Sequence, residues 1–128
     1  MEEIVICDTN ILIELYRNNR DVRQELMQIG QNRLAVSAIS AGELIFGARN
    51  KAELQQIVAD LASIKIFSLD ERITQQSLEL MKSFSLSHRL SLPDALIAAT
   101  ALAKNLPFYT LNTKDFKYLP GIRLWNNT

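Results

Sequence analysis

Three carboxylates each stand alone in a window of 10 to 15 residues that holds no other charged side chain. They are Asp8 within residues 4–13, Glu43 within residues 34–48 and Asp94 within residues 90–103. Such windows usually form core, where an unpartnered carboxylate costs on the order of several kcal/mol or takes up a proton. Because no Lys or Arg lies nearby in the sequence, either each acid finds a distant partner or the acids neutralise a shared cation.

A fourth acid, Asp115, joins this candidate set from the end of the chain. Lys114 and Lys117 flank it, so a solvated charge near a helix start is an alternative. The chain has one cysteine and one histidine, which leaves carboxylate oxygens as the available ligands. A hard oxygen site of this kind favours Mg²⁺ or Mn²⁺ over zinc.

Helical phase supports a shared site. The positions three and four residues from Glu43 are Ile39, Ser40, Phe46 and Gly47. They predict that this carboxylate lies on or beside the inward face of its helix. Asp94 is in phase with Ile97, Ala98 and Ala101, again an inward face.

Each acid also has a purely structural interpretation. Asp8 could cap the helix that follows it, and Asp94 fits the third position of a helix that Ser91 caps. Ser40 would be the cap nearest Glu43, which would place Glu43 at the third position of that helix.

Length and composition bound the class of protein. A chain of 128 residues with 48% apolar residues predicts one compact domain spanning residues 1–128. No window resembles a signal peptide or a membrane span, and the lone Cys7 suits a reducing compartment, so we expect a soluble cytoplasmic protein. Net charge is zero. Four acids gathered in one pocket would nevertheless leave fourteen basic and ten acidic residues outside it, a surface suited to phosphates.

Short β-branched runs alternate with longer amphipathic patterns. Strands are expected at residues 4–7, 34–36, 64–69, 108–111 and 122–125. Helices are expected at residues 9–17, 21–29, 40–48, 51–63, from 71 to about 84, and 92–105, with a polar connection at 85–91. This alternation predicts an α/β fold with a mainly parallel sheet of about five strands covered on both faces. Ligands bind such sheets at the carboxyl ends of the strands, where Asp8 and the 112–115 loop stand.

Four blocks then resemble a known family. They read VICDTNILIELY, VSAISAGELIFGA, LSLPDALIAATAL and YTLNTKDF, and each contains one of the four acids. In this order and spacing they resemble PIN-domain ribonucleases, above all the VapC toxins of toxin–antitoxin pairs. The resemblance implies a three-layer α/β/α sandwich and cutting of RNA that leaves a 5′-phosphate. It also implies a cognate antitoxin and a homodimer.

The resemblance implies that the four acids build a metal site, and we assign each acid a role in it. Asp8 and Asp94 would ligate the metal, Glu43 would hold and help to deprotonate a water, and Asp115 would bind a second metal or a further water. Thr9, Asn10, Thr110 and Asn112 would line or support the site. Arg89 and Lys114, which lie within a few residues of the acids, are candidate RNA contacts.

The histidine, tyrosine and tryptophan residues say less about function than the acids do. His88 is either a base or, more in keeping with a polar loop, a surface side chain. Three tyrosines and one tryptophan are too few to indicate a stacking platform, and Trp125 suggests packing or subunit contact.

Rival functions remain open. A receiver domain would use Asp70, Thr110 and Lys114, but it needs paired acids after the first strand, where Thr9 follows Asp8. A haloacid-type phosphatase needs a second acid at the position of Asn10. The remaining alternative is an inactive PIN-like module that binds RNA or protein.

Overall fold

A four-stranded parallel sheet forms the centre of the computed structural model, which describes residues 2–125. The strands are β1 (Val5–Cys7), β2 (Leu34–Ser37), β3 (Lys65–Phe67) and β4 (Phe108–Tyr109). Their order is β3-β2-β1-β4, and the register pairs Ile6 with Ala35 on one side and with Phe108 on the other. This places β1 in the interior of the sheet, as its unbroken apolar run predicts.

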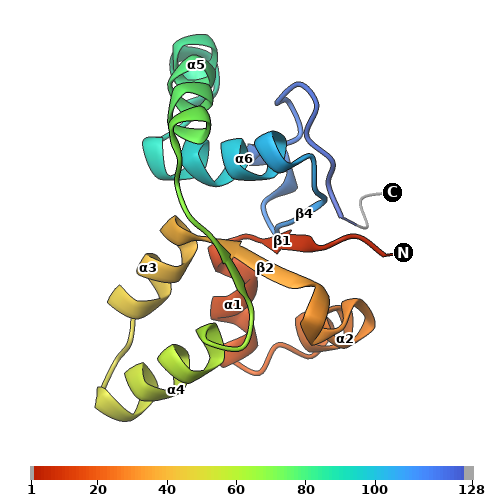
Figure 1. The fold of residues 1–128 in the computed structure, drawn as a ribbon, viewed down its shortest axis with the longest axis vertical. Coiled ribbons are helices and arrows are strands. Elements are labelled where there is room, and N and C mark those ends of the chain that lie inside the picture. The colour runs from red at the N-terminus through yellow and green to blue at the C-terminus, as the bar shows by residue number, and fades with distance from the viewer. Residues whose placement is uncertain (1, 126–128) are drawn as a thin grey trace.

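Helices cover both faces of the sheet. They are α1 (Thr9–Tyr16), α2 (Arg20–Ile29), α3 (Ala38–Phe46), α4 (Lys51–Leu61), α5 (Glu71–His88) and α6 (Leu92–Lys104), with short 3₁₀ turns η1 (Gln31–Arg33) and η2 (Thr113–Asp115). Helices α1 to α4 lie below the sheet in Figure 1, and α5 and α6 lie above it. The predicted three-layer α/β/α architecture is confirmed.

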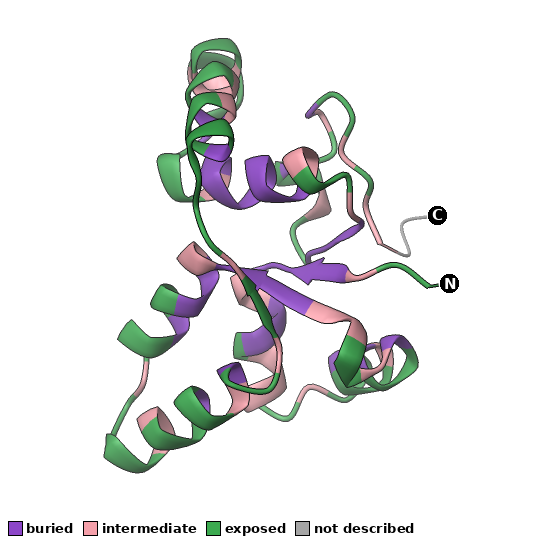
Figure 2. Cartoon of the chain, in the orientation of Figure 1, coloured by how far each residue is buried: buried purple, intermediate pink, exposed green. Residues whose placement is uncertain are grey.

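Alternation along β1 divides the core into two layers. Val5 and Cys7 pack with α1 to α4, whereas Ile6 packs with α6 and the C-terminal segment. All three are buried, because each face of the strand meets a helical layer. Figure 2 shows the result, with buried residues gathered at the sheet and on the helix sides that face it. Cys7 is accordingly a buried free thiol, and burial raises its pKa to about 12.

Side-chain caps fix where the helices begin. The caps of α1 to α6 are Asp8, Asn19, Ser37, Asn50, Asp70 and Ser91. The predicted roles of Asp8 and Ser91 as caps are confirmed. The prediction for Ser40 is wrong, since Ser37 accepts the bond from the Ser40 amide at 3.1 Å and the helix starts at Ala38. Two serines three residues apart can both cap, and the sequence does not separate them.

Two predictions for the C-terminal half, the end of one helix and a fifth strand, are wrong. The expected polar connection at 85–91 is helical as far as His88, and Arg89 then closes α5 with a left-handed backbone, φ 55°. The expected fifth strand is, within the described residues, one isolated parallel bridge between Phe108 and Leu124. Hydrogen bonds from Phe108 and Trp125 form this bridge, at 2.7 and 2.8 Å.

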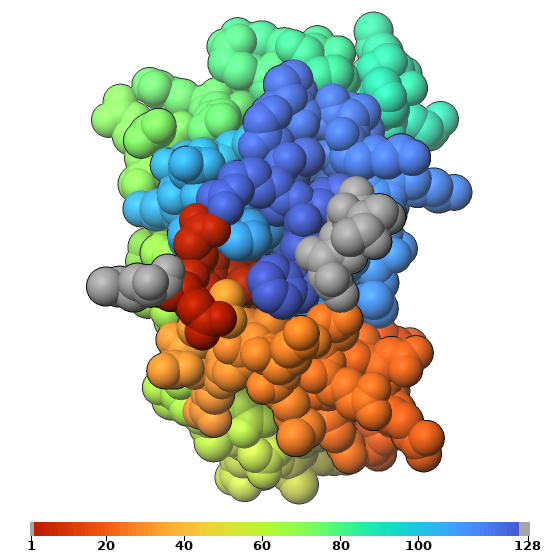
Figure 3. Space-filling model, turned by 90° about the vertical axis from the view of Figure 1, so that its right-hand side faces the viewer, coloured from red at the N-terminus to blue at the C-terminus, as the bar shows by residue number. Residues whose placement is uncertain are grey.

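The first residues are held against the C-terminal segment at the amino end of the sheet. Figure 3 shows that end, with the beginning of the chain next to its last described residues. Arg123 donates to Glu3 at 2.8 Å, and the Arg33 side chain donates to the Glu3 carbonyl, also at 2.8 Å. In residues 2–125 no helix is long and apolar enough to cross a membrane.

The strand order also excludes the receiver interpretation. Asp70 follows β3, which is an edge strand, and it caps α5 through the Ile73 amide at 2.8 Å. A phosphoacceptor in that fold lies next to the first strand, as the doubly wound order 2-1-3-4-5 requires. Here β2 and β4 flank β1, so the receiver alternative is wrong.

Candidate functional site

The four acids come from segments that leave the carboxyl ends of three adjacent strands or from the helix packed beside them. Asp8 follows β1, Glu43 lies in α3 after β2, and Asp115 lies in η2 after β4. Asp94 lies in the first turn of α6. Since parallel strands end at one edge of the sheet, residues far apart in the sequence meet there.

Asp8 is the most deeply placed acid, with 6% of its surface exposed. Its Oδ1 accepts a hydrogen bond from the Thr9 amide at 2.8 Å, and its Oδ2 accepts one from the Thr110 hydroxyl at 2.8 Å. The pKa of Asp8 is raised to about 6. Burial is the largest cause of this rise, the charges of Asp94 and Glu43 add to it, and the two hydrogen bonds oppose it. The carboxylate is therefore fixed in place but poorly neutralised.

Thr110 connects the two chain segments beside Asp8. Its single hydroxyl proton goes to Asp8, and its oxygen accepts from the Asn112 amide at 3.0 Å and the Asn10 side chain at 3.5 Å. Asn10 in turn accepts from the Leu111 amide at 3.3 Å. The start of α1 is thus bonded to the segment after β4, and all hydrogen-bonding positions of the Thr110 hydroxyl are used.

Glu43 is held by Thr9. The Thr9 hydroxyl lies 2.6 Å from Oε1 of Glu43 and 2.8 Å from the hydroxyl of Ser40. A carboxylate only accepts, so the Thr9 proton goes to Glu43 and the Ser40 proton points at the Thr9 oxygen. Ser40 is fully buried and is a supporting residue that the sequence suggested only as a helix cap.

Of the two predicted positions for Glu43, on the inward face of its helix or beside it, the structure shows the second. Glu43 is exposed, and Phe46, expected on the same inward side, has 93% of its surface exposed. The buried side of α3 is carried by Ser40, Ala41 and Leu44. Glu43 therefore lies at the rim and reaches Asp8's neighbour Thr9 from outside the core.

Asp94 is half-buried above a buried helix face. Ile97, Ala98 and Ala101 are buried, as the phase predicts. Burial raises the pKa of Asp94, as do the charges of Glu43 and Asp115, while a hydrogen bond with Ser91 opposes the shift. Asp115 is exposed in η2, and its amide donates to the Asn112 carbonyl at 3.0 Å.

The acids repel one another without a basic partner. Within residues 2–125 no salt bridge joins any of the four to a Lys or Arg. The charges of neighbouring carboxylates raise the pKa of Asp8 and of Asp94, and such a group of acids suits a hard divalent cation. Among the described residues, no three acidic, histidine or cysteine side chains are gathered tightly enough to hold an ion as they stand. A cation would therefore have to draw the exposed side chains of Glu43 and Asp115 toward Asp8 and Asp94.

The two candidate RNA contacts are free of local ion pairs. Arg89 is exposed at the left-handed end of α5, and Lys114 is exposed in η2 beside Asp115. In the described part of the chain neither forms a salt bridge. Arg89 precedes the helix that carries Asp94, and Lys114 directly precedes Asp115.

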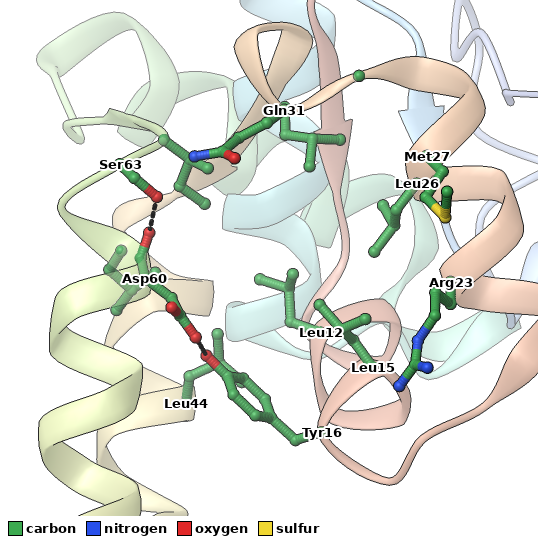
Figure 4. Close-up of a pocket in the computed structure, with 14 residues that line it drawn as sticks. Leu12, Leu15, Tyr16, Arg23, Leu26, Met27, Gln31, Leu44, Asp60 and Ser63 are labelled. Carbon is green, nitrogen blue, oxygen red and sulfur yellow. Dashed lines mark hydrogen bonds between the residues drawn. The ribbon is translucent and has the colours of Figure 1, made fainter.

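An apolar cavity of about 500 Å³ lies between α1, α2 and α4. Leu12, Leu15 and Leu26 point into it in Figure 4, and Tyr16 donates to Asp60 at its wall at 2.5 Å. Tyr16 and Leu44 also line a smaller hollow of about 210 Å³ that reaches Glu43. The two hollows thus share part of their wall, and Glu43 is the one of the four acids that lines the smaller hollow.

The family follows from a match over residues 5–121 to the PIN domain, a stretch that contains all four acids. The chain belongs to the PIN-domain family. This PIN domain is 34% identical over 115 residues to ribonuclease VapC10 of Mycobacterium tuberculosis, which covers 88% of the chain and 86% of that relative. It is 26% identical over 121 residues to the tRNA(fMet)-specific endonuclease VapC of Shigella flexneri, with 91% and 92% covered. A toxin–antitoxin complex from Klebsiella pneumoniae contains a similar chain, with 34% identity, a TM-score of 0.79 and 92% and 94% covered.

Proposed function

We propose that this PIN domain is a metal-dependent endoribonuclease and the toxin of a toxin–antitoxin pair. The observation that carries the proposal is Asp8, a buried carboxylate whose pKa is raised to about 6, next to Asp94 and Glu43 at the carboxyl end of β1. The names of the ribonuclease relatives support RNA as the substrate.

The donor set fits Mg²⁺ or Mn²⁺. We assign Asp8 and Asp94 as direct ligands, because they are the two whose pKa burial raises. When bound, the ion supplies Lewis-acid activation of the attacking water and offsets the charge that develops on the phosphate. We assign Asp115 to the outer side of the same site.

The side chains of this protein supply position and a proton acceptor. Glu43 is exposed toward solvent yet held at its Oε1 by Thr9, so one oxygen is oriented and the other is free to accept a proton from water. Thr110 and Thr9 hold the two oxygens of Asp8 and so fix its plane. From the family resemblance we further propose that hydrolysis leaves the phosphate on the 5′ end of the released strand.

An antitoxin partner is proposed on two grounds. The similar chain from Klebsiella pneumoniae was solved in a toxin–antitoxin complex. The apolar cavity, continued by the hollow at Glu43, offers an antitoxin segment a path to the acids. Substituting Met27, an exposed residue at the cavity, by Glu should weaken binding of the cognate antitoxin without unfolding the chain. Homodimerisation, one domain over the whole chain and a cytoplasmic location stay predictions.

The deciding experiment replaces one carboxylate at a time. Asp8→Asn and Asp94→Asn should lower Mg²⁺- or Mn²⁺-dependent cleavage of RNA at least 10³-fold. Asp70→Asn is the matched control, because Asn caps a helix as well as Asp and Asp70 contributes to the raised pKa of neither acid. A thermal shift with each ion should be present in the wild type and reduced in Asp8→Asn.

Two results would overturn the proposal. Cleavage that continues at the same rate in excess chelator would exclude the ion. A folded wild type that shows the thermal shift but cuts no RNA, tRNA included, would favour the inactive binding module instead.

A further inference from the structure

Two rings separated by 30 positions in the sequence stack beside the candidate site. The rings of His88 and Tyr118 have centroids 3.8 Å apart and planes 15° apart. His88 ends α5, six residues before Asp94, and Tyr118 lies three residues after Asp115. The stack therefore joins the chain segment that carries Asp94 to the one that carries Asp115.

Among the described residues, no aromatic ring other than Tyr118 stacks on the His88 ring, and His88 is exposed. Phe84 meets the stack edge-on, with centroids 5.1 Å from Tyr118 and 5.8 Å from His88. Because Phe84 is nearer to Tyr118 than to His88, it lies at the side of the pair and not over the outer face of His88. His88 is exposed, and its Nδ1 lies 2.7 Å from the Ser87 hydroxyl, a contact in the plane of the ring.

The surroundings fit a nucleotide. Arg89 directly follows His88, and Lys117 directly precedes Tyr118, so each ring has a cation next to it in the chain. Both cations are exposed. The charges of Asp115 and Asp94 raise the pKa of Tyr118, after burial, which places its hydroxyl within electrostatic range of the acids. A base stacked on His88 would thus lie near the acids, on a part of the surface where two exposed cations are available to phosphates.

We propose that the outer face of His88, backed by Tyr118, stacks one base of the substrate RNA next to the bond that is cut. The inference rests on the proposed ribonuclease function, and it adds a site that positions the RNA strand on the protein. Every base has a flat face, so the platform holds the strand with little regard to sequence and requires an unpaired nucleotide. Phe84 and Tyr118 fix the ring in advance, so little side-chain freedom is lost on binding.

The test removes the ring and the base separately. Binding is measured by fluorescence anisotropy in the Asp8→Asn background, which keeps a short single-stranded RNA intact, and cleavage is measured with Asp8 present. His88→Ala should weaken binding about tenfold, equal to about 1.4 kcal/mol, and should raise KM by a similar factor with kcat within about twofold. His88→Phe, which keeps a ring, should restore binding. Leu86→Ala is the matched control on the same helical turn, since that side chain is 98% exposed and belongs to no ring contact in the described residues.

An RNA with one abasic nucleotide completes the design. An abasic position that contacts the platform should lower binding about tenfold in the parent protein and should have no further effect in His88→Ala. Equal binding of all RNAs by His88→Ala and its parent would overturn the platform while leaving cleavage, and hence the nuclease, in place. If the wild type cuts no RNA but His88→Ala still loses binding, the stacking of a base on His88 is supported and the proposed nuclease function is contradicted. If no RNA binds the parent at all, the platform is wrong.

Discussion

The hydroxyl of Thr110 donates a hydrogen bond to Oδ2 of Asp8 at 2.8 Å, across 102 positions of the chain. The bond connects the ends of β1 and β4, two strands that lie side by side in the sheet. It opposes the rise in the pKa of Asp8 that burial causes. The position and the charge of Asp8 therefore depend on a residue at the other end of the sequence.

Replacing Thr110 by Val tests that dependence. The change keeps the shape and removes the donor, so the pKa of Asp8 should rise above about 6. Activity should fall roughly 10- to 100-fold, the usual cost of losing a group that orients a metal ligand. The pKa is read from the ¹³C shift of the Asp8 carboxyl in chelator. Thr110→Ser should restore both values, and an unchanged pKa in Thr110→Val would contradict the role.

A double-mutant cycle tests the hydrogen bond between Thr9 and Glu43. Thr9→Val should lower kcat about tenfold, because Glu43 then loses the contact at 2.6 Å that orients it. Glu43→Gln should cost more, and adding Thr9→Val to it should cost little further, since both act through the same carboxylate. Thr9→Ser should behave as the wild type. Independent, additive losses would show that Thr9 acts elsewhere.

The charge of Asp8 should make the protein less stable as pH rises. The folded pKa is about 6 against an ordinary value of 3.8, so the folded state binds the proton more tightly than the unfolded chain. Stability from this group is present below about pH 4 and is lost as pH rises through 6, with a total of about 3 kcal/mol. Asp8→Asn, which carries no charge, should therefore unfold at a higher temperature than the wild type at pH 8 in chelator. The gap should close at pH 4. A wild type that is more stable than Asp8→Asn at pH 8 without metal would contradict the assigned shift.

Arg89 and Lys114 should contribute to RNA affinity and not to chemistry. Arg89→Gln or Lys114→Gln should raise KM a fewfold, leave kcat unchanged and reduce the salt dependence of binding by about one counterion each. Lys104→Gln is the control, because it removes the same kind of exposed charge from the last residue of α6, about 15 Å along the helix from Asp94. Salt slopes that are equal in all three variants would place the RNA on another surface.

The sequence by itself predicted the class of fold, which the structure confirms, and it singled out the four acids as a candidate site. Lone carboxylates in apolar windows are informative because burial without a partner is costly. The helix caps Asp8 and Ser91 follow from local rules that act over three or four residues. The buried run of β1 likewise predicts a strand covered on both faces, which the structure confirms. The family blocks point to the same residues.

Only the tertiary structure decided how those residues meet. The bond from Thr110 to Asp8, the exposure of Glu43, and the stack of His88 on Tyr118 all depend on strand order and on where α5 ends. A helical phase places Phe46 and Glu43 on the same side but does not say which neighbour covers that side, and here none does for Phe46. The tyrosines and the tryptophan counted along the chain were too few to predict a stacking platform, whereas the fold stacks Tyr118 on His88 with ring centroids 3.8 Å apart. Long-range contacts are set by the packing of whole elements, and no local pattern in the sequence records them.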